Sequence, residues 1–297
     1  MINFLGLAGR TAGIVRGKQI SEKLSGSEYG EAHFTRIGSN PITIIVRNHI
    51  PTAAAIHRKA GKLVGYDVCD MPAGDAFFGK KNISIEQYCH PDYDFFIVNN
   101  DSCAKDLMQH TDKPVYVIPH HTVNYEAFKN EVREKVQRIG YVGLPEQLSR
   151  SKEISDYCKG KGIDFFSAHP NSREECDAAF RKIDIGIVFL DSSTHNPELL
   201  KLVKRFKPNT KMSNMQSYGI PTVSVSYDSY EQFGKGVFVR VENIDELISE
   251  IDSLIDNYDK RSSLSGRSYE VGCEVGIDPV TKMYVAMAKD LSERFIR

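Results

Sequence analysis

Short runs of β-branched and aromatic residues alternate with longer helical patterns along almost the whole chain, and this alternation constrains the fold more than any other feature. Helical patterns cover, for example, Arg150–Gly160, Ser172–Ile183 and Ile244–Asn257. The runs that we expect to form strands are Ile2–Ala8, Ala32–Ile37, Ile42–Val46, Leu63–Val68, Phe95–Val98, Val115–Ile118, Arg138–Val142, Phe165–Ala168, Ile185–Leu190, Thr222–Ser226 and Val237–Val239. Alternating strands and helices predict an α/β protein in which helices cover both faces of parallel sheets.

The expected strands divide into two groups. A polar and charged stretch begins after Ile118 and continues to Lys135, and the next strand begins at Arg138. One sheet that held all the strands would be unusually large, so we expect two sheets. The 297 residues are enough for two domains of ordinary size. We therefore predict an N-terminal domain over residues 1–122 and a C-terminal domain over residues 123–297.

Charge and cysteine content exclude several classes of protein. The net charge is −1 and neither half has a strong excess of one sign, which disfavours a nucleic-acid partner. The six cysteines form no C-x-x-C pair, so a zinc or redox motif has no support, and a reducing cytoplasm is the expected location. No apolar run approaches the ~18 residues of a membrane-spanning helix. Peripheral attachment to a membrane surface stays compatible with the sequence.

The segment from Phe206 to Val223 predicts a basic loop, a short helix, a glycine stop and a buried strand. Lys207 and Lys211 fall before or in the first turn of that helix, where unpaired N–H groups and the helix dipole favour a phosphate. Gly219 can supply a left-handed helix end. The alternative interpretation is an ordinary solvated lysine pair at a helix–strand junction.

The last helical pattern carries an apolar stripe that requires a packing surface. Apolar side chains recur every fourth position, and two further residues lie alongside them. The members of this stripe are Met283, Met287, Leu291, Phe295, Tyr284 and Ala288.

The order of several short motifs resembles the GT-B glycosyltransferases, and family 4 in particular. The segments that carry the resemblance are Val64–Asp70, Pro114–Pro119, Ile139–Gly143, Ile183–Ile187 and Lys207–Val223. The resemblance implies two Rossmann-like domains that face a cleft, with the C-terminal helix packing back on the N-terminal domain. It also implies transfer of a sugar from a nucleoside-diphosphate sugar to a saccharide or lipid-linked acceptor. A retaining outcome, no cofactor and no essential metal belong to the same expectation.

Two departures from the family matter. The chain is short for this fold, so we expect trimmed loops in the acceptor domain. Many family-4 enzymes carry a pair of glutamates near the donor sugar and ribose, whereas Phe206 and Asn214 occupy the corresponding positions here. Asn214 or backbone groups would then have to recognise the ribose.

Candidate donor-binding residues cluster in the second half. Lys211 is the first choice for stabilising the negative charge that develops on the leaving diphosphate, and we assign it a catalytic role. Gly143 follows the first strand of that half, where open α/β sheets bind ligands, and a glycine permits close approach. The remaining donor-binding candidates are Arg205, Lys207, Ser213, Asn214 and Asp191.

In the first half, two loops follow strands and should reach the same cleft. The first contains Gly9, Arg10 and Gly13, and the second contains Arg47 and His49. His49 is a candidate general base, with a capping or surface position as the alternative. For Arg10 and for Arg16, which lies in the first loop's continuation, we favour an exposed position.

Other functions and sites stay open. A sugar-nucleotide epimerase on the same fold would need cleft carboxylates, and a non-catalytic module would bind without turnover. Transfer to a nucleic-acid base would require salt-sensitive DNA affinity, which the charge disfavours. Asp67 and Asp70 could hold Mg²⁺, but a turn or cap role is the favoured interpretation. His120 and His121 are expected to be structural.

Overall fold

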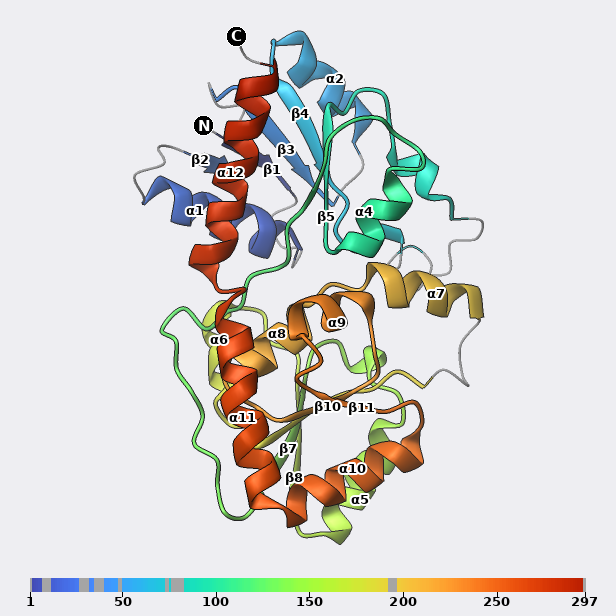
Figure 1. Ribbon diagram of the computed structural model, residues 1–297, viewed down its shortest axis with the longest axis vertical. Coiled ribbons are helices and arrows are strands. Elements are labelled where there is room, and N and C mark those ends of the chain that lie inside the picture. Colours follow the sequence, from blue (N-terminus) through green and yellow to red (C-terminus); the bar gives the residue numbers. More distant parts are fainter. Residues whose placement is uncertain are drawn as a thin grey trace. The chain divides into compact units, whose positions relative to one another are not determined.

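The computed structural model describes residues 2–6, 12–26, 32–34, 40–47, 50–72, 75, 83–191 and 197–295 (Figure 1). The chain divides into two compact units. Unit 1 comprises Met1–His121, Arg205–Pro208 and Ile277–Arg297, and unit 2 comprises Thr122–Lys204 and Asn209–Gly276. Unit 1 therefore contains segments that are far apart in the sequence, whereas only Arg205–Pro208 separate the two segments of unit 2.

Unit 1 is built on a parallel sheet with the strand order β2-β1-β3-β4-β5-β6. Its strands are β1 (Ile2–Leu5), β2 (Ala32–Phe34), β3 (Ile42–Val46), β4 (Leu63–Asp67), β5 (Phe95–Val98) and β6 (Val115–Val117). The side chains of β3 and β5 are buried throughout, as their uninterrupted apolar sequences require. Strand β1 ends at Leu5, earlier than the run Ile2–Ala8 predicted, and the rest of the run Ala32–Ile37 after Phe34 lies outside the described residues.

The helical elements of unit 1 cover this sheet. They are the π-helical turn η1 (Gly13–Lys18), α1 (Gln19–Ser25), α2 (Pro51–Lys59), the 3₁₀ turn η2 (Ile85–Tyr88), α4 (Asp101–Leu107) and α12 (Ile277–Phe295). Helix α12, drawn in red in Figure 1, lies beside α1. The ring of Tyr284 on α12 meets the ring of Phe4 edge to face at 5.6 Å, so the last helix completes the core of unit 1.

The packing stripe of α12 differs from the expected one. Met283 and Phe295 are 37% and 50% exposed, so their assignment to the stripe is wrong. The buried side chains of this helix are Ile277, Val280, Thr281, Tyr284, Met287, Ala288 and Leu291. The stripe thus begins earlier and follows mixed i+3 and i+4 steps, as a straight helix does on a flat partner.

Unit 2 is built on a second parallel sheet with the strand order β11-β10-β9-β7-β8. Its strands are β7 (Arg138–Val142), β8 (Asp164–Ala168), β9 (Ile185–Val188), β10 (Thr222–Ser224) and β11 (Val239–Arg240). The helical elements are η3 (Pro145–Gln147), α5 (Ser151–Gly160), α6 (Arg173–Phe180), α7 (Pro197–Phe206), α8 (Thr210–Ser217), α9 (Asp228–Gly234), α10 (Ile244–Asp256) and α11 (Tyr258–Cys273). The last two residues of α7 belong to unit 1.

Helix α8 ends as the sequence predicts. Gly219 has a φ of +66°, and its N–H donates to the carbonyl of Gln216 at 2.8 Å. The N–H of Ile220 donates to the carbonyl of Met215 at 2.9 Å. These two bonds form a Schellman motif, which satisfies carbonyls at the helix end and turns the chain into the buried strand β10.

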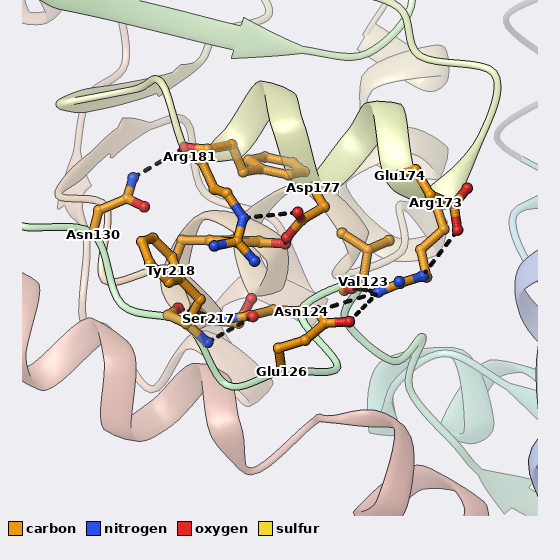
Figure 2. A network of polar contacts seen from close by, with 12 residues as sticks. Val123, Asn124, Glu126, Asn130, Arg173, Glu174, Asp177, Arg181, Ser217 and Tyr218 are labelled. Carbon is orange, nitrogen blue, oxygen red and sulfur yellow. Dashed lines mark hydrogen bonds and ion pairs between the residues drawn. The ribbon is translucent and has the colours of Figure 1, made fainter.

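A polar network fixes the chain segment that follows His121 to unit 2 (Figure 2). The amide of Asn124 donates to the carbonyl of Ser217 at 2.6 Å. Asp177 on α6 accepts hydrogen bonds from Tyr218 at 2.6 Å and from Arg181 at 2.7 Å (Figure 2). The C-terminal end of α8 is therefore fastened both to this segment and to α6.

Candidate functional site

The strand order of unit 2 creates a crevice at one place on its sheet. The chain runs from β7 outward to β8 and then returns to the other side of β7 as β9. At such a switch point the loops after the two central strands diverge, and ligands of open α/β sheets bind there. Gly143 directly follows β7, and Asp191 lies shortly after β9.

Lys211 lies on Gly143 at this switch point. Lys211 is in the first turn of α8, and a Cβ atom placed on Gly143 would be only 2.4 Å from the Lys211 Cε and 3.2 Å from its Nζ. Gly143 also has a φ of +153°, a conformation that favours glycine. The Lys211 side chain thus occupies space that a side chain at position 143 would fill.

The Lys211 ammonium group is held at a defined place. It donates to the amide oxygen of Gln147 at 2.7 Å and lies 5.2 Å from the centre of the Tyr141 ring. The Tyr141 hydroxyl donates to the carbonyl of Leu144 at 2.9 Å, which fixes the loop after Gly143. Burial raises the pKa of Tyr141, so the phenol stays a neutral donor.

A second cation lies at the end of the same strands. The guanidinium of Arg150 pairs with the buried carboxylate of Asp191 at 2.8 Å. Arg150 has a φ of +56° and directly precedes helix α5. Arg150 was not among the residues predicted from the sequence, although it follows an expected strand and a glycine turn and begins an expected helix.

Among the residues that the structure describes, the N-terminus of α8 has no side-chain cap, as is also the case for α5 and α9. Asn209 instead donates to the Ser213 hydroxyl at 2.7 Å. Asn214 is buried, and its amide oxygen accepts from the Val123 N–H at 2.8 Å. Ser213 and Asn214 therefore serve contacts within unit 2. The helices whose starts are capped by a side chain in this unit are α6, α10 and α11.

Arg205 and Lys207 belong to unit 1. One guanidinium nitrogen of Arg205 donates to both carboxylate oxygens of Asp106, at 2.7 and 2.6 Å. The Arg205 carbonyl accepts from the amide of Asn100 at 2.9 Å and from the thiol of Cys103 at 3.1 Å. The structure thus joins Arg205 to helix α4 of the same unit.

Unit 1 has its own switch point, between β1 and β3. Of the site residues predicted there, Gly9, Arg10 and His49 lie outside the described residues. Gly13 begins η1, and π-helical turns are frequent at functional sites. Arg47 follows β3 with a φ of +63° and pairs with Asp70 at 3.2 Å.

Arg16 is buried, so the expected surface position is wrong. Its guanidinium lies 2.5 Å from the carboxylate of Asp67 and donates to the carbonyl of Ile118 at 2.9 Å. Burial acts to lower the pKa of Arg16, but the Asp67 charge outweighs it and the pKa is raised. A buried charge of this kind survives because it is paired. Arg16 therefore connects η1, β4 and the end of β6.

The pairing of Asp67 with Arg16, and of Asp70 with Arg47, also bears on the magnesium interpretation. Both carboxylates face arginines, and Asp67 accepts in addition from the N–H of Cys69 at 3.2 Å. Within the described ranges there is no group of three or more His, Cys, Asp or Glu side chains placed to hold a metal ion. The turn role favoured for Asp67 agrees with its bond to Cys69.

His120 and His121 are both buried where β6 leads out of unit 1. The His121 ring bonds to the carbonyl of Val15 at 2.9 Å. Burial, and then the charge of Arg16, lower the pKa of His120 well below its ordinary value. This histidine is therefore neutral at physiological pH.

Comparisons with known proteins give the fold. No protein-family model matches the sequence, and no curated protein sequence matches it. Among solved structures, Anabaena HepE in complex with UDP and glucose matches with a TM-score of 0.63 at 12% identity, covering 98% of this chain and 99% of that one. A putative UDP-N-acetylglucosamine 2-epimerase from Listeria monocytogenes matches with a TM-score of 0.61 at 11% identity, covering 100% and 98%. The trehalose-6-phosphate synthase OtsA matches with a TM-score of 0.55 at 14% identity, covering 84% and 72%.

These matches confirm the fold class expected from the sequence, which is the GT-B fold with two Rossmann-like α/β parts. Among the described residues, no helix is both long and apolar enough to cross a bilayer.

Proposed function

We propose that this chain is a glycosyltransferase that takes its sugar from a nucleoside-diphosphate sugar. The observation that carries the proposal is the position of Lys211, in the first turn of α8 and on Gly143, at the switch point of unit 2. A lysine and an uncapped helix start together form a phosphate site of a common kind. The match to HepE, which was solved with UDP, supports a uridine nucleotide as the donor.

Lys211 has a chemical role in this proposal. When the glycosidic bond to the diphosphate breaks, negative charge develops on the leaving oxygen while the sugar becomes oxocarbenium-like. A cation held in place before the reaction stabilises that charge without having to reorganise. Gln147 and the ring of Tyr141 hold the ammonium in this way. Arg150, paired with Asp191, is the second cation that we place at the diphosphate.

The finer assignments extend from the sequence resemblance. We place the acceptor, a saccharide or a lipid-linked sugar, in unit 1, with Arg47 and His49 at its site and His49 as the general base. Donor binding by Lys207 and Arg205 stays a prediction from the sequence. A retaining outcome and a relation to family 4 belong to the same proposal.

A sugar-nucleotide epimerase is the second candidate function, because the Listeria protein matches over nearly the full length of both chains. The two activities give different products from the same donor. A transferase releases the nucleoside diphosphate only when an acceptor is present or water replaces it. An epimerase converts the donor into its epimer without any acceptor, so chromatography of the donor after incubation separates them.

A thermal-shift panel with UDP, GDP, ADP, CDP and dTDP, with and without Mg²⁺, tests the proposed site directly. A ligand at 100 times its dissociation constant stabilises the folded protein by about 2.7 kcal/mol. We expect one nucleotide to raise the Tm by several degrees, and Lys211→Ala to remove most of that rise. Lys159→Ala is the matched control. Lys159 is an exposed lysine near the C-terminal end of α5, whereas Arg150 directly precedes the N-terminal end of that helix. An equal rise in Lys211→Ala and wild type would refute the role of Lys211.

A further inference from the structure

Gln147, which accepts a hydrogen bond from Lys211, carries no charge. An ammonium group has only donors, so the amide oxygen of Gln147 must face it, and the two atoms are 2.7 Å apart. A carboxylate at the same place would form an ion pair and cancel the lysine charge. Gln147 therefore restrains the position of the Lys211 ammonium group without adding a negative charge beside it.

The position of Gln147 is itself fixed from both sides. Its N–H donates to the carbonyl of Leu144 at 3.0 Å, and that carbonyl also accepts from the Tyr141 hydroxyl at 2.9 Å. The next residue, Leu148, is buried in the core, and the N–H of Ser149 donates to the carbonyl of Phe189 at 3.0 Å. The loop from Leu144 to Ser149 is thus attached to the ends of both central strands, β7 and β9.

We infer that Gln147 determines the selectivity of this site for phosphorylated ligands. It orients Lys211 toward a diphosphate through a neutral hydrogen bond, so that the site binds a nucleoside diphosphate in preference to the uncharged nucleoside. Gln147 is a positioning residue, since it acts through Lys211. The inference rests on the proposed function, because it assumes that a nucleotide diphosphate is the ligand of Lys211.

The test compares UDP with uridine, which shares the base and ribose but lacks the phosphates. Gln147→Glu keeps the size and an acceptor but adds a negative charge, and Gln147→Met removes the acceptor. We expect Gln147→Glu to raise the Kd for UDP by about tenfold or more, equivalent to about 1.4 kcal/mol. Gln147→Met should raise it by about threefold, because the lysine charge remains but is less well placed. Uridine binding should change by less than about twofold in both variants, since uridine carries no charge for Lys211 to recognise.

Gln137→Glu provides the matched control. Gln137 is exposed and lies just before β7, at the opposite end of the strand that leads to Gly143, about 20 Å away for a strand of this length. The same added charge at that distance is screened at physiological salt, so UDP affinity should stay as in wild type.

The outcomes separate this inference from the proposed function. If wild type binds UDP and Lys211→Ala does not, but Gln147→Glu binds UDP as wild type does, the inference fails alone. An equal weakening of UDP and uridine binding in Gln147→Glu would show a general structural effect and would also overturn the inference. If wild type binds neither UDP nor uridine, the inference and the proposed uridine-nucleotide site both fail.

Discussion

Replacing Gly143 with alanine should test the contact on which the donor site depends. The new methyl group would stand 2.4 Å from the Lys211 Cε and 2.9 Å from the Tyr141 hydroxyl oxygen. Carbon atoms in contact stay about 3.5–4.0 Å apart, so the lysine stem must move by more than about 1 Å. That movement breaks or weakens the bond between Lys211 and Gln147.

Two terms set the magnitude of the Gly143→Ala effect. Holding an alanine at a φ of +153° costs about 1–3 kcal/mol of folding free energy. Loss of a hydrogen bond from a charged donor adds about 1 kcal/mol, at the low end because the lysine is partly solvated. The free energy of unfolding should therefore fall by about 2–4 kcal/mol, and the Tm by several degrees. UDP affinity should fall by about tenfold, because the displaced ammonium no longer faces the ligand.

Gly160→Ala is the control for this experiment. Gly160 is the last residue of α5, and a Cβ placed there would meet no atom within 4 Å. Alanine should be neutral or stabilising there by up to about 1 kcal/mol, without effect on UDP. Calorimetry gives the stability of each variant, and titration with UDP gives the affinity. A Gly143→Ala protein with the Tm and UDP affinity of wild type would show that the glycine does not make room for Lys211.

Three further substitutions test interactions within unit 1 or within unit 2. Arg16→Met should lower the stability of unit 1 by about 3–5 kcal/mol in denaturant titration, because it leaves the Asp67 charge buried and unpaired, and Arg16→Met with Asp67→Leu should recover most of the loss. Burial acts to raise the pKa of Asp177, but hydrogen bonds from its partners lower it, so its stabilising effect is present above about pH 4 and is lost as pH falls further. Asp177→Asn should accordingly flatten the acid limb of the Tm-versus-pH curve, and an unchanged limb would refute this account. Gly266→Ala, in the interior of α11 with open space around it, should raise the free energy of unfolding by about 0.8–1 kcal/mol, measured by denaturant midpoint.

Local chemistry in the sequence predicted much of the fold. The apolar runs predicted the strands of both sheets, and Gly219 predicted the end of α8, because an apolar run and a glycine that permits a left-handed helix end are local features of the sequence. The helix that ends the chain was predicted, but its buried face was not. Met283 and Phe295 are apolar and have the expected spacing, yet both are exposed. The face of α12 that packs in unit 1 is instead the one that contains Ile277, Tyr284 and Leu291.

The sequence predicted less of the candidate site than of the fold. Gly143 and Lys211 were selected separately, and only the strand order shows that one lies on the other. Gln147 and Arg150 carry no motif, since a glutamine and an arginine in a loop are common, and their contacts with Lys211 and Asp191 join residues far apart in the sequence. The prediction for Arg16 was wrong for the same reason, because Arg16 is in η1 and its partner Asp67 is in β4, far along the chain.

The discontinuous make-up of unit 1 has a consequence for how the protein is made. The sheet of unit 1 is complete by His121, but helix α12, whose Tyr284 and Leu291 are fully buried, is translated only after all of unit 2. At about 5–20 residues per second, the nascent chain waits on the order of ten seconds for that helix. During this time the apolar face that α12 covers stays open to solvent, so unit 1 has to be protected from aggregation until synthesis is nearly finished. All residues of unit 2, in contrast, have been synthesised before the ribosome reaches Ile277.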